Sequence, residues 1–328
     1  MTEAYDMSVA ISSFNRDDKV GETLERLFEC DLSRFENIEV IVVDDGSPRP
    51  VADVLQRMGP PPQKMDVRVI RQENSGIGAT RNRGFREAKA QLVLFLDDDI
   101  LVKPSTLNDF VEAHREHPGA VIFGNYPFVS HESESLRQFA VGLYGYDRLT
   151  AEPAYERVNA ITSGLLCVDK SKLGGMDDFY RDDLSVPAAE EYEIIYRFDK
   201  LGIPIFNALH ISAIHNHHLE LPWLVEQQFK YGRGTAEAII KYPEITKLEK
   251  FAKMKATLDA VGGRGLRSRV KAAAASATGR ELLKVYSRFI ERLRPAQTRN
   301  RIYGLLASAY YWAGYREGLR TFRRGKVS

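Results

Sequence analysis

Three consecutive carboxylates, Asp97, Asp98 and Asp99, directly follow the apolar run from Leu92 to Leu96. Three neighbouring negative charges at the end of a strand repel one another, and a bound cation relieves that cost. Mg²⁺ and Mn²⁺ prefer oxygen ligands and bridge carboxylates to phosphates. We therefore predict a divalent metal site, for Mn²⁺ or Mg²⁺, in which Asp97 and Asp99 either share one ion or divide a ribose and the metal between them; the alternative is a capped, solvated turn.

A second acidic cluster, Asp44-Asp45-Gly46-Ser47, follows the apolar, β-branched run from Ile38 to Val43. A carboxylate in this position can accept hydrogen bonds from a nucleotide base or from a ribose hydroxyl. Alternatively, the cluster is an Asp-Gly turn in which Ser47 caps the next helix. The cluster alone does not decide between these two interpretations.

The segment from Gly76 to Arg81 has the spacing GxGxxR. It differs from the dinucleotide fingerprint in its last position, and it follows the third predicted strand instead of the first. We therefore exclude an NAD site there. The glycines can still bring backbone N–H groups close to an anion, and Arg81 would add positive charge.

Two further polar clusters contain residue types that can ligate a metal or act as a general base. His215-Asn216-His217-His218 follows a predicted strand, and an imidazole beside Asp99 would favour Mn²⁺ over Mg²⁺. His215 is the candidate ligand because it directly ends that strand, and exposed loop histidines are the alternative.

Glu190-Glu191 opens a predicted helix, where acidic residues suit the helix dipole, but an adjacent carboxylate pair can also supply a general base.

The elements that must position these residues alternate between apolar strands and amphipathic helices. Predicted strands cover residues 9–11, 38–43, 67–70, 92–96, 120–125 and 162–168, with a strand pair over 203–214. Predicted helices cover about 20–28, 51–58, 79–90 and 188–200, and the chain after Pro222 is mainly helical. The first strands lack a polar alternation, which predicts an α/β fold with a Rossmann-like, mostly parallel sheet flanked by helices. Ligands of such sheets bind beyond the carboxyl ends of the strands, where these polar clusters would meet.

Positive charge is concentrated in the last part of the chain. The 328 residues carry a net charge of +1, but the segment from Gly262 onward holds 16 Lys or Arg against 3 Asp or Glu. Apolar and aromatic residues lie among these charges: Leu282, Val285, Tyr286, Phe289, Leu293, Leu305, Leu306, Tyr310 and Trp312. We expect either peripheral contact with an anionic membrane or helices that pack on the rest of the chain or on a second copy. No recognised motif accompanies the charge, so nucleic acid is not an expected partner.

Two cysteines, Cys30 and Cys167, are too few and too far apart for a disulfide framework. The first residues are acidic and contain no apolar signal region. The longest uncharged apolar stretch, Ile302 to Tyr315, is too short to span a hydrocarbon layer of about 30 Å. We therefore expect a cytoplasmic protein, peripheral at the inner face of the cell membrane where the basic segment contacts lipid.

Six motifs, taken together and in order, resemble the family 2 glycosyltransferases of the GT-A fold. They are Ser12-Ser13-Phe14-Asn15-Arg16, Val42 to Ser47, Asn74-Ser75-Gly76 with Ala79 to Gly84, Phe95 to Asp99, Gly174 to Phe179, and Glu190 to Glu193 with Arg197. The resemblance covers roughly residues 8–235. It implies a catalytic domain over residues 1–220, with a nucleotide-binding half at about 1–100 and an acceptor half at about 101–220, followed by a C-terminal helical extension over 221–328.

The resemblance implies inverting transfer of a sugar from a nucleoside-diphosphate donor, commonly a UDP-sugar, to a hydroxyl of a glycan or lipid-linked acceptor. By the resemblance, Ser12 and Asp45 line the nucleoside pocket, Arg81 faces the nucleotide, and Asp97 and Asp99 form the DxD signature, with Asp99 as the direct metal ligand. The further donor-binding residues that we expect are Phe14, Asn15, Gly76, Asp97 and Asp98, and His215 is the expected third metal ligand. The resemblance assigns acceptor contacts to Gly175, Met176, Asp177 and Asp178. The general base falls on Glu191, next to Glu190, where the family usually has a shorter Asp; Glu190 or Glu193 is the alternative base.

Two other functions fit part of the pattern. A sugar nucleotidyltransferase also needs a metal and a nucleotide pocket, but it normally carries a loop rich in glycine and lysine after the first strand. Residues 12–16 contain neither glycine nor lysine. A non-catalytic GT-A scaffold is the second alternative, and the complete Asp triplet and the acidic helix start argue against it.

Overall fold

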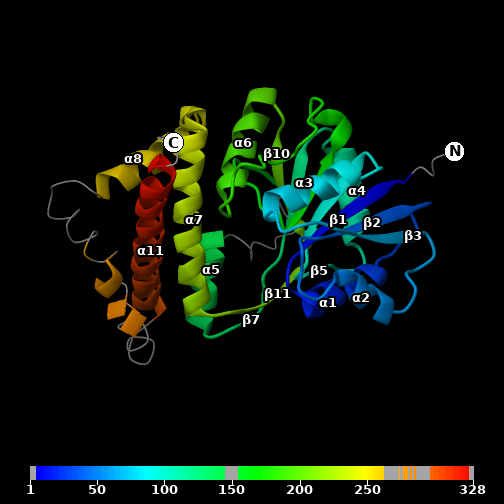
Figure 1. The fold of residues 1–328 in the computed structure, drawn as a ribbon, viewed down its shortest axis with the longest axis horizontal. Helices are drawn as coiled ribbons and strands as arrows, with labels where there is room; N and C mark the ends of the chain where they lie inside the picture. Colours follow the sequence, from blue (N-terminus) through cyan, green and yellow to red (C-terminus); the bar gives the residue numbers. More distant parts are fainter. Residues whose placement is uncertain are drawn as a thin grey trace. The chain divides into compact units, whose positions relative to one another are not determined.

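The structure is a computed structural model that describes residues 5–144, 154–261 and 296–324, with 273, 276–279, 281–282 and 284–285 between them. The chain divides into two compact units. The first comprises Met1–Val129, Gly145–Asp183 and Arg197–His217, and the second comprises Ser130–Tyr144, Leu184–Tyr196 and His218–Ser328. Figure 1 shows strands in the first unit and long helices in the second.

In the described part of the first unit, eight strands form one sheet in the order β3-β2-β1-β4-β9-β6-β10-β8. The strands are β1 (Met7–Ser13), β2 (Ile38–Asp44), β3 (Met65–Arg71), β4 (Leu92–Asp97), β6 (Val121–Asn125), β8 (Tyr155–Arg157), β9 (Leu165–Asp169) and β10 (Ile205–Ser212). β3, β2, β1 and β4 are mutually parallel, as β6 and β10 are, whereas β9 is antiparallel to β4 and β6 and β8 is antiparallel to β10. The predicted mostly parallel α/β sheet is confirmed.

Helices cover both faces of this sheet. α1 (Asp17–Phe28), α2 (Val51–Arg57) and α4 (Thr106–Glu116) share one apolar core with the odd-numbered residues of β1, such as Val9. α3 (Ile77–Glu87) packs on the opposite face, where a Cβ on Gly84 would lie only 2.9 Å from the Cβ of Ala10. Glycine therefore permits the close approach of α3 to β1. Figure 1 shows α3 on one side of β1 and β2, with α1 and α2 on the other.

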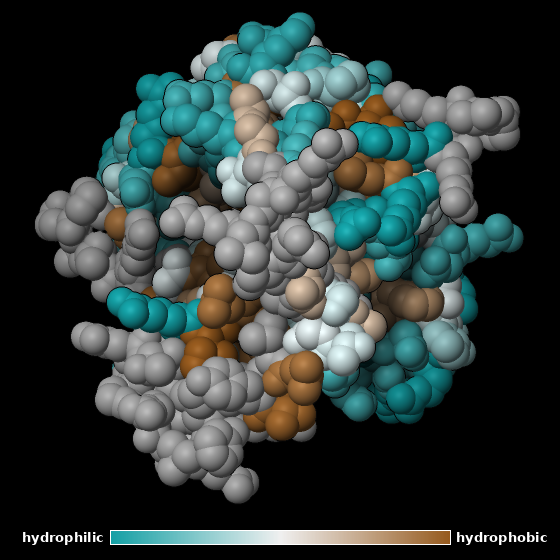
Figure 2. Space-filling model, turned by 90° about the vertical axis from the view of Figure 1, so that its left-hand side faces the viewer, coloured by the Kyte–Doolittle hydropathy of each residue, from teal (hydrophilic) through white to brown (hydrophobic). Residues whose placement is uncertain are grey.

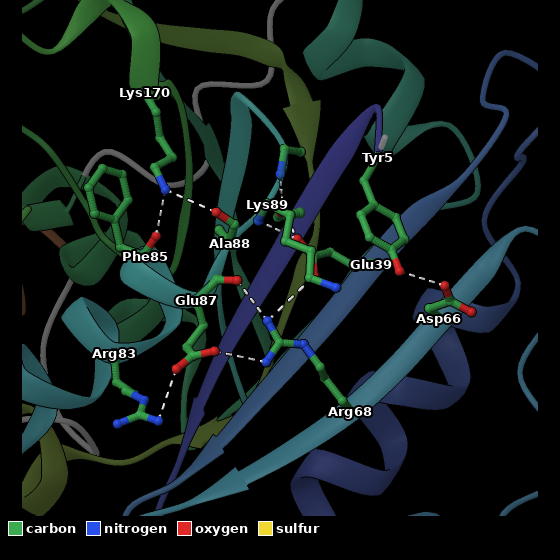
Figure 3. Close-up of polar contacts among 12 residues, drawn as sticks. Tyr5, Glu39, Asp66, Arg68, Arg83, Phe85, Glu87, Ala88, Lys89 and Lys170 are labelled. Carbon is green, nitrogen blue, oxygen red and sulfur yellow. Dashed lines mark hydrogen bonds and ion pairs between the residues drawn. The ribbon is translucent and has the colours of Figure 1, made fainter. Parts of the chain in front are cut away.

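A hydrogen-bond network closes the amino-terminal end of the sheet, away from the polar strand ends. The buried Glu39 carboxylate accepts hydrogen bonds from Ser8 Oγ (2.6 Å) and Lys89 N (2.5 Å). Arg68 lies between Glu39 and Glu87 and forms ion pairs with both (Figure 3). The Glu39 carboxylate is therefore held by side-chain and backbone partners at this end of the sheet.

A short sheet of β5 (Ile100–Leu101), β11 (Ile214–Leu219) and β7 (Phe128–His131) begins directly after the Asp triplet. His215 pairs with Ile100 in this sheet, and Asn216 N donates to the carbonyl oxygen of Asp99 (2.7 Å). The prediction that His215 ends a strand is therefore wrong. β10 stops at Ser212, and after Ala213 the chain enters β11, so the polar histidines lie within a strand.

The described residues of the second unit are mainly helical. Its helices are α5 (Glu134–Tyr144), the first part of α6 (Ala189–Leu201), α7 (Leu221–Lys241), α8 (Glu249–Val261) and α11 (Ala296–Arg324), with a short 3₁₀ turn η2 (Pro243–Lys247). α7 and α11 pack side by side (Figure 1), and a Cβ on Gly232 would lie 1.9 Å from the carbonyl oxygen of Tyr311. The glycine lets the two helix backbones meet.

The basic segment is only partly described. Leu306, Tyr310 and Trp312 on α11 are buried, so these residues form part of the helical core, whereas Leu305 is 61% exposed. Tyr286, Phe289 and Leu293 lie outside the described residues. On the face drawn in Figure 2, the hydrophobic residues gather in several separate patches. None of the helices within the described ranges is long and apolar enough to cross a membrane.

Candidate functional site

The register of the parallel strands brings the predicted polar strand ends side by side. Ser12 on β1 lies opposite Asp97 on β4, and Ser13 lies opposite Asp44 on β2. Both serines are buried. The carboxyl-terminal edge of the first unit therefore presents two acidic strand ends, separated by the end of one strand.

At the end of β2, Asp45 holds the turn that leads into α3. Its Oδ1 accepts hydrogen bonds from Gln72 Nε2 (2.8 Å) and Ser75 N (2.9 Å), and its Oδ2 accepts one from Gly76 N (3.0 Å). Gly46 and Gly76 have φ angles of 80° and 88°, a backbone region that favours glycine. The Asp45 carboxylate thus fixes the Gly76 turn beside the strand end.

The neighbouring Asp44 is buried and also bonded to the protein. Its Oδ1 accepts a hydrogen bond from Ser47 N (2.8 Å), and its Oδ2 accepts from Val51 N (3.2 Å) and Arg71 Nη1 (2.8 Å). The alternative in which Ser47 caps the following helix is wrong, because Ser47 Oγ instead accepts a hydrogen bond from Asn15 N (2.9 Å). Asp44 therefore binds the first N–H of α2.

At the end of β4, two arginines contact the Asp triplet. Arg81 Nη2 lies 2.8 Å from Asp97 Oδ1, and the Arg81 guanidinium lies over the ring of Tyr180. Arg16, which follows β1, places Nη1 2.6 Å from Asp99 Oδ2 and 3.2 Å from Asp98 Oδ1. The negative charge of the triplet is therefore offset by one arginine from the loop after β1 and one from helix α3.

The three carboxylates of the triplet have different environments. Burial raises the pKa of Asp98 to about 7, against the opposing charge of Arg16. Burial would also raise the pKa of Asp99, but the hydrogen bond and charge of His215, with the charge of Arg16, outweigh burial and lower it. Asp97 is one-third exposed. Asp99 is therefore kept as a carboxylate, the form that a cation requires.

His215 supplies a second metal-type donor next to Asp99. Its Nε2 lies 3.3 Å from Asp99 Oδ2, and its ring stacks against Phe128 with a centroid separation of 4.8 Å. In the described ranges, no group of three His, Cys, Asp or Glu residues could hold a metal ion. A carboxylate and an imidazole fit Mn²⁺ as a two-donor set, provided that ligand oxygens complete the coordination.

The loop after β1 is fixed in a specific conformation. Asn15 has a φ of 55°, an uncommon value for a residue with a side chain, and its N–H is bonded to Ser47. Phe14 is 48% exposed, which is high for a large apolar side chain. The loop therefore presents an aromatic ring to solvent beside the two acidic strand ends.

The predicted acceptor segment forms an exposed turn of the first unit. Gly174 and Gly175 have φ angles of 67° and 76°, and both are exposed, as are Asp177 and Asp178. Arg197 on α6 donates to the sulfur of Met176 (3.3 Å) and to the carbonyl oxygen of Phe179 (2.5 Å). Asp178 also forms an ion pair with Arg86 on α3. Two arginines thus hold the second half of the turn.

Glu190 and Glu191 belong to the second unit, whereas the other predicted site residues belong to the first. They lie in the first turn of α6, directly after Ala188, which has a φ of 73°. Glu190 is buried and Glu191 is half-buried. Burial lowers the pKa of Lys250, and the charge of Glu191 opposes that shift. The acidic helix start is therefore built into this unit and is not a freely solvated cap.

Arg16 stands in one of the sequence motifs without a predicted role for its side chain, and Arg71 stands outside them. Arg16 bridges Asp98 and Asp99, and Arg71 binds Asp44. A signal was available for both. Arg16 follows β1 and Arg71 ends β3, so each arginine stands at the end of a strand that neighbours an acidic strand end.

Residues 8–160 match the model of glycosyl transferase family 2. A curated relative, the undecaprenyl-phosphate 4-deoxy-4-formamido-L-arabinose transferase of Edwardsiella ictaluri, is 32% identical over 107 residues, which are 33% of this chain and 33% of that protein. The chain spans 32%, 48% and 64% of the length of three other curated relatives. The sequence similarity is therefore confined to part of each protein.

Solved structures show the same fold at low sequence identity. S. aureus TarS 1-349 in complex with UDP has a TM-score of 0.52 and 17% identity, with 98% of this chain and 92% of that chain covered. The mannosyltransferase PcManGT of Pyrobaculum calidifontis, in complex with GDP-Man and Mn²⁺, has a TM-score of 0.57 and 16% identity, with 96% and 89% covered. The predicted GT-A fold is confirmed.

Proposed function

We propose that this glycosyltransferase transfers a sugar from a nucleoside-diphosphate donor with inversion of configuration. Its residues 8–160 match the family 2 model. One observation carries the proposal most directly. Asp97, Asp98 and Asp99 stand beside Ser12 at the carboxyl ends of parallel strands, where ligands of such sheets bind. The donor is a UDP-sugar in this proposal, and the acceptor is a hydroxyl of a glycan or lipid-linked glycan.

In this proposal the first unit binds the donor. Ser12, Asp45 and the Gly76 turn line the nucleoside position, and Phe14 offers an exposed ring for the base. Asn15 shapes the loop. Arg81 is held between Asp97 and Tyr180, so its charge is fixed close to the position of the diphosphate. Asp97 and Asp98 complete the donor contacts.

Asp99 and His215 would hold a divalent cation, whereas Asp97, whose Oδ1 pairs with Arg81 Nη2, would contact the donor. When bound, Mn²⁺ or Mg²⁺ would offset the charge that builds on the departing diphosphate. The depressed pKa of Asp99 supports this assignment because a metal ligand must be deprotonated. The imidazole nitrogen of His215 as a second donor favours Mn²⁺ over Mg²⁺.

Glu191 is the proposed general base, with Glu190 adjacent to it. One Glu191 oxygen accepts the proton of the acceptor hydroxyl, whose oxygen forms the new bond to the anomeric carbon. The bond from that carbon to the diphosphate oxygen breaks, and its electron pair leaves with the diphosphate. Attack from the face opposite the leaving group inverts the configuration. The exposed turn from Gly175 through Met176 and Asp177 to Asp178 is the proposed acceptor contact.

The charge of the C-terminal region supports a peripheral contact with an anionic membrane, which would suit a lipid-linked acceptor. Leu305 is the exposed apolar side chain of α11 available for such a contact. Co-sedimentation with vesicles of anionic lipid at low salt measures it. Binding that is equal for neutral and anionic vesicles, or absent from both, would contradict the membrane proposal and leave the transferase proposal intact.

Transfer and donor hydrolysis should be measured over UDP-, GDP- and dTDP-sugars with Mn²⁺, Mg²⁺ or EDTA. We expect turnover with one nucleotide class and its loss in EDTA. Glu191→Gln should bind the donor as the parent does but lose turnover by about 10³-fold, within the usual contribution of a general base. Near-parent turnover in Glu191→Gln would move the base to Glu190 or Glu193.

A further inference from the structure

One nitrogen of Arg16 bridges two carboxylates of the triplet. Nη1 lies 2.6 Å from Asp99 Oδ2 and 3.2 Å from Asp98 Oδ1. A structural Arg–carboxylate pair commonly uses two nitrogens in a bidentate fork, but here a single atom contacts two residues. Nη1 therefore lies between two carboxylate oxygens, as a bound cation would.

The atom that Arg16 contacts is the one proposed for the metal. Asp99 Oδ2 also lies 3.3 Å from His215 Nε2, so the guanidinium nitrogen and the imidazole converge on one oxygen. A divalent cation held by Asp99 and His215 would need that oxygen. Arg16 and a cation therefore cannot both keep their closest contact with Asp99.

Arg16 can leave this position without a change in the loop. Its side chain is 52% exposed, whereas the side chains of Asp98 and Asp99 are 6% and 10% exposed. The backbone is fixed on both sides, by Asn15 N bonded to Ser47 Oγ and by Val20 N bonded to the Arg16 carbonyl oxygen (3.0 Å). Rotation of the side chain into solvent would thus release its contacts with both carboxylates without a change in the backbone.

The second arginine at the triplet lacks this freedom. The side chain of Arg81 is 8% exposed, and it is confined between Asp97 and the ring of Tyr180. Arg81 is therefore a fixed charge at the triplet, and Arg16 is an exchangeable one. The difference indicates separate roles for two residues of the same type.

We propose that Arg16 is a displaceable counter-ion, which neutralises Asp98 and Asp99 in the empty site and competes with the divalent cation for them. This inference rests on the metal site of the proposed function. A cation alone must displace Arg16 and binds weakly. A nucleoside diphosphate supplies oxygen ligands for the cation and negative charge for the released guanidinium, so the donor and the cation bind together.

The test is the affinity for Mn²⁺, measured from the electron paramagnetic resonance signal of the free ion, with and without UDP. If Arg16 occupies the cation position nine-tenths of the time, its removal tightens Mn²⁺ binding about tenfold. Arg16→Gln should therefore bind Mn²⁺ about tenfold more tightly without UDP, and UDP should improve that affinity less than in the parent. Arg49→Gln is the matched control, because Arg49 pairs with Asp17 and does not contact the triplet.

Suppose that the parent binds Mn²⁺ in the presence of UDP. Arg16→Gln that then binds Mn²⁺ no more tightly than the parent would overturn the inference and leave the proposed function standing. A parent that fails to bind Mn²⁺ even with UDP would overturn the metal site and this inference with it. If Arg16→Gln does not fold, as judged from its unfolding midpoint, Arg16→Met keeps the aliphatic stem, removes the charge and should give the same tightening.

Discussion

At the end of β2, Asp44 and Asp45 accept hydrogen bonds mainly from backbone N–H groups, whereas at the end of β4 the Asp triplet is paired with arginine side chains. The two strand ends are separated only by β1 and have similar residues. Four backbone groups, those of Ser47, Val51, Ser75 and Gly76, bind the first pair. Arg16 and Arg81 bind the triplet.

The kind of donor determines what each carboxylate can do. A backbone N–H at a helix start or in a tight turn is fixed, so removing its acceptor leaves a buried donor unsatisfied. A guanidinium on a half-exposed side chain can return to water at little cost. We therefore expect changes at the end of β2 to act mainly on stability, and changes at the end of β4 to act mainly on ligand binding.

The largest effect is expected from Asp44→Ala. The substitution leaves Ser47 N and Val51 N without their acceptor and removes one of the partners of Arg71. We expect a loss of about 3 kcal/mol in the free energy of unfolding, measured by urea denaturation. Asp66→Ala, at an exposed aspartate of β3, is the control and should change it by less than about 0.5 kcal/mol. A small change in Asp44→Ala would remove the distinction between the two strand ends.

Asp99→Asn tests the other side of the comparison. The substitution keeps the shape of the side chain but removes the charge that binds Arg16 and the proposed cation. We expect about a hundredfold loss in Mn²⁺-dependent affinity for UDP, equivalent to about 2.7 kcal/mol, in isothermal titration calorimetry. The free energy of unfolding should change by less than about 1 kcal/mol, because the Arg16 side chain is half-exposed. A destabilisation as large as that of Asp44→Ala would contradict the assignment of the triplet to ligand binding.

The sequence predicts the strand ends well because each apolar run stops at a polar cluster, as at Val43 and Leu96. It does not predict which donors satisfy each cluster. Asp44 and Asp97 look alike in sequence, and the difference arises from the register of β1 with β2 and β4 and from the loops that follow. The position of His215 was missed for a related reason, since the pairing of β11 with β5 is a long-range contact.

Asp45→Asn is expected to have an intermediate effect and sharpens the comparison, because Asp45 is both a structural acceptor and a proposed donor contact. An amide in place of the carboxylate loses one acceptor oxygen. Either Gln72 and Ser75, which share Oδ1, or Gly76, which binds Oδ2, must then lose a hydrogen bond. We expect a loss of about 2 kcal/mol in unfolding free energy. UDP affinity should be measured on the folded protein at low temperature. A loss of UDP affinity without a loss of unfolding free energy would show that Asp45, like the Asp triplet, acts mainly on ligand binding.

The smallest effect is expected from Gly76→Ala. An added Cβ would have no heavy atom within 4 Å, so no steric clash accompanies the change, but the residue would have to adopt a φ of 88°. This backbone strain should cost about 1 kcal/mol. Gly59→Ala, where a Cβ also meets nothing and φ is not positive, is the matched control and should be neutral or slightly stabilising. Because Gly76 N binds Asp45, the strain weakens the carboxylate's backbone contacts without altering its charge. If Gly76→Ala weakens UDP binding as well as stability, the shape of the turn at β2 contributes to donor recognition; unchanged UDP affinity would leave the β2 end a purely structural one.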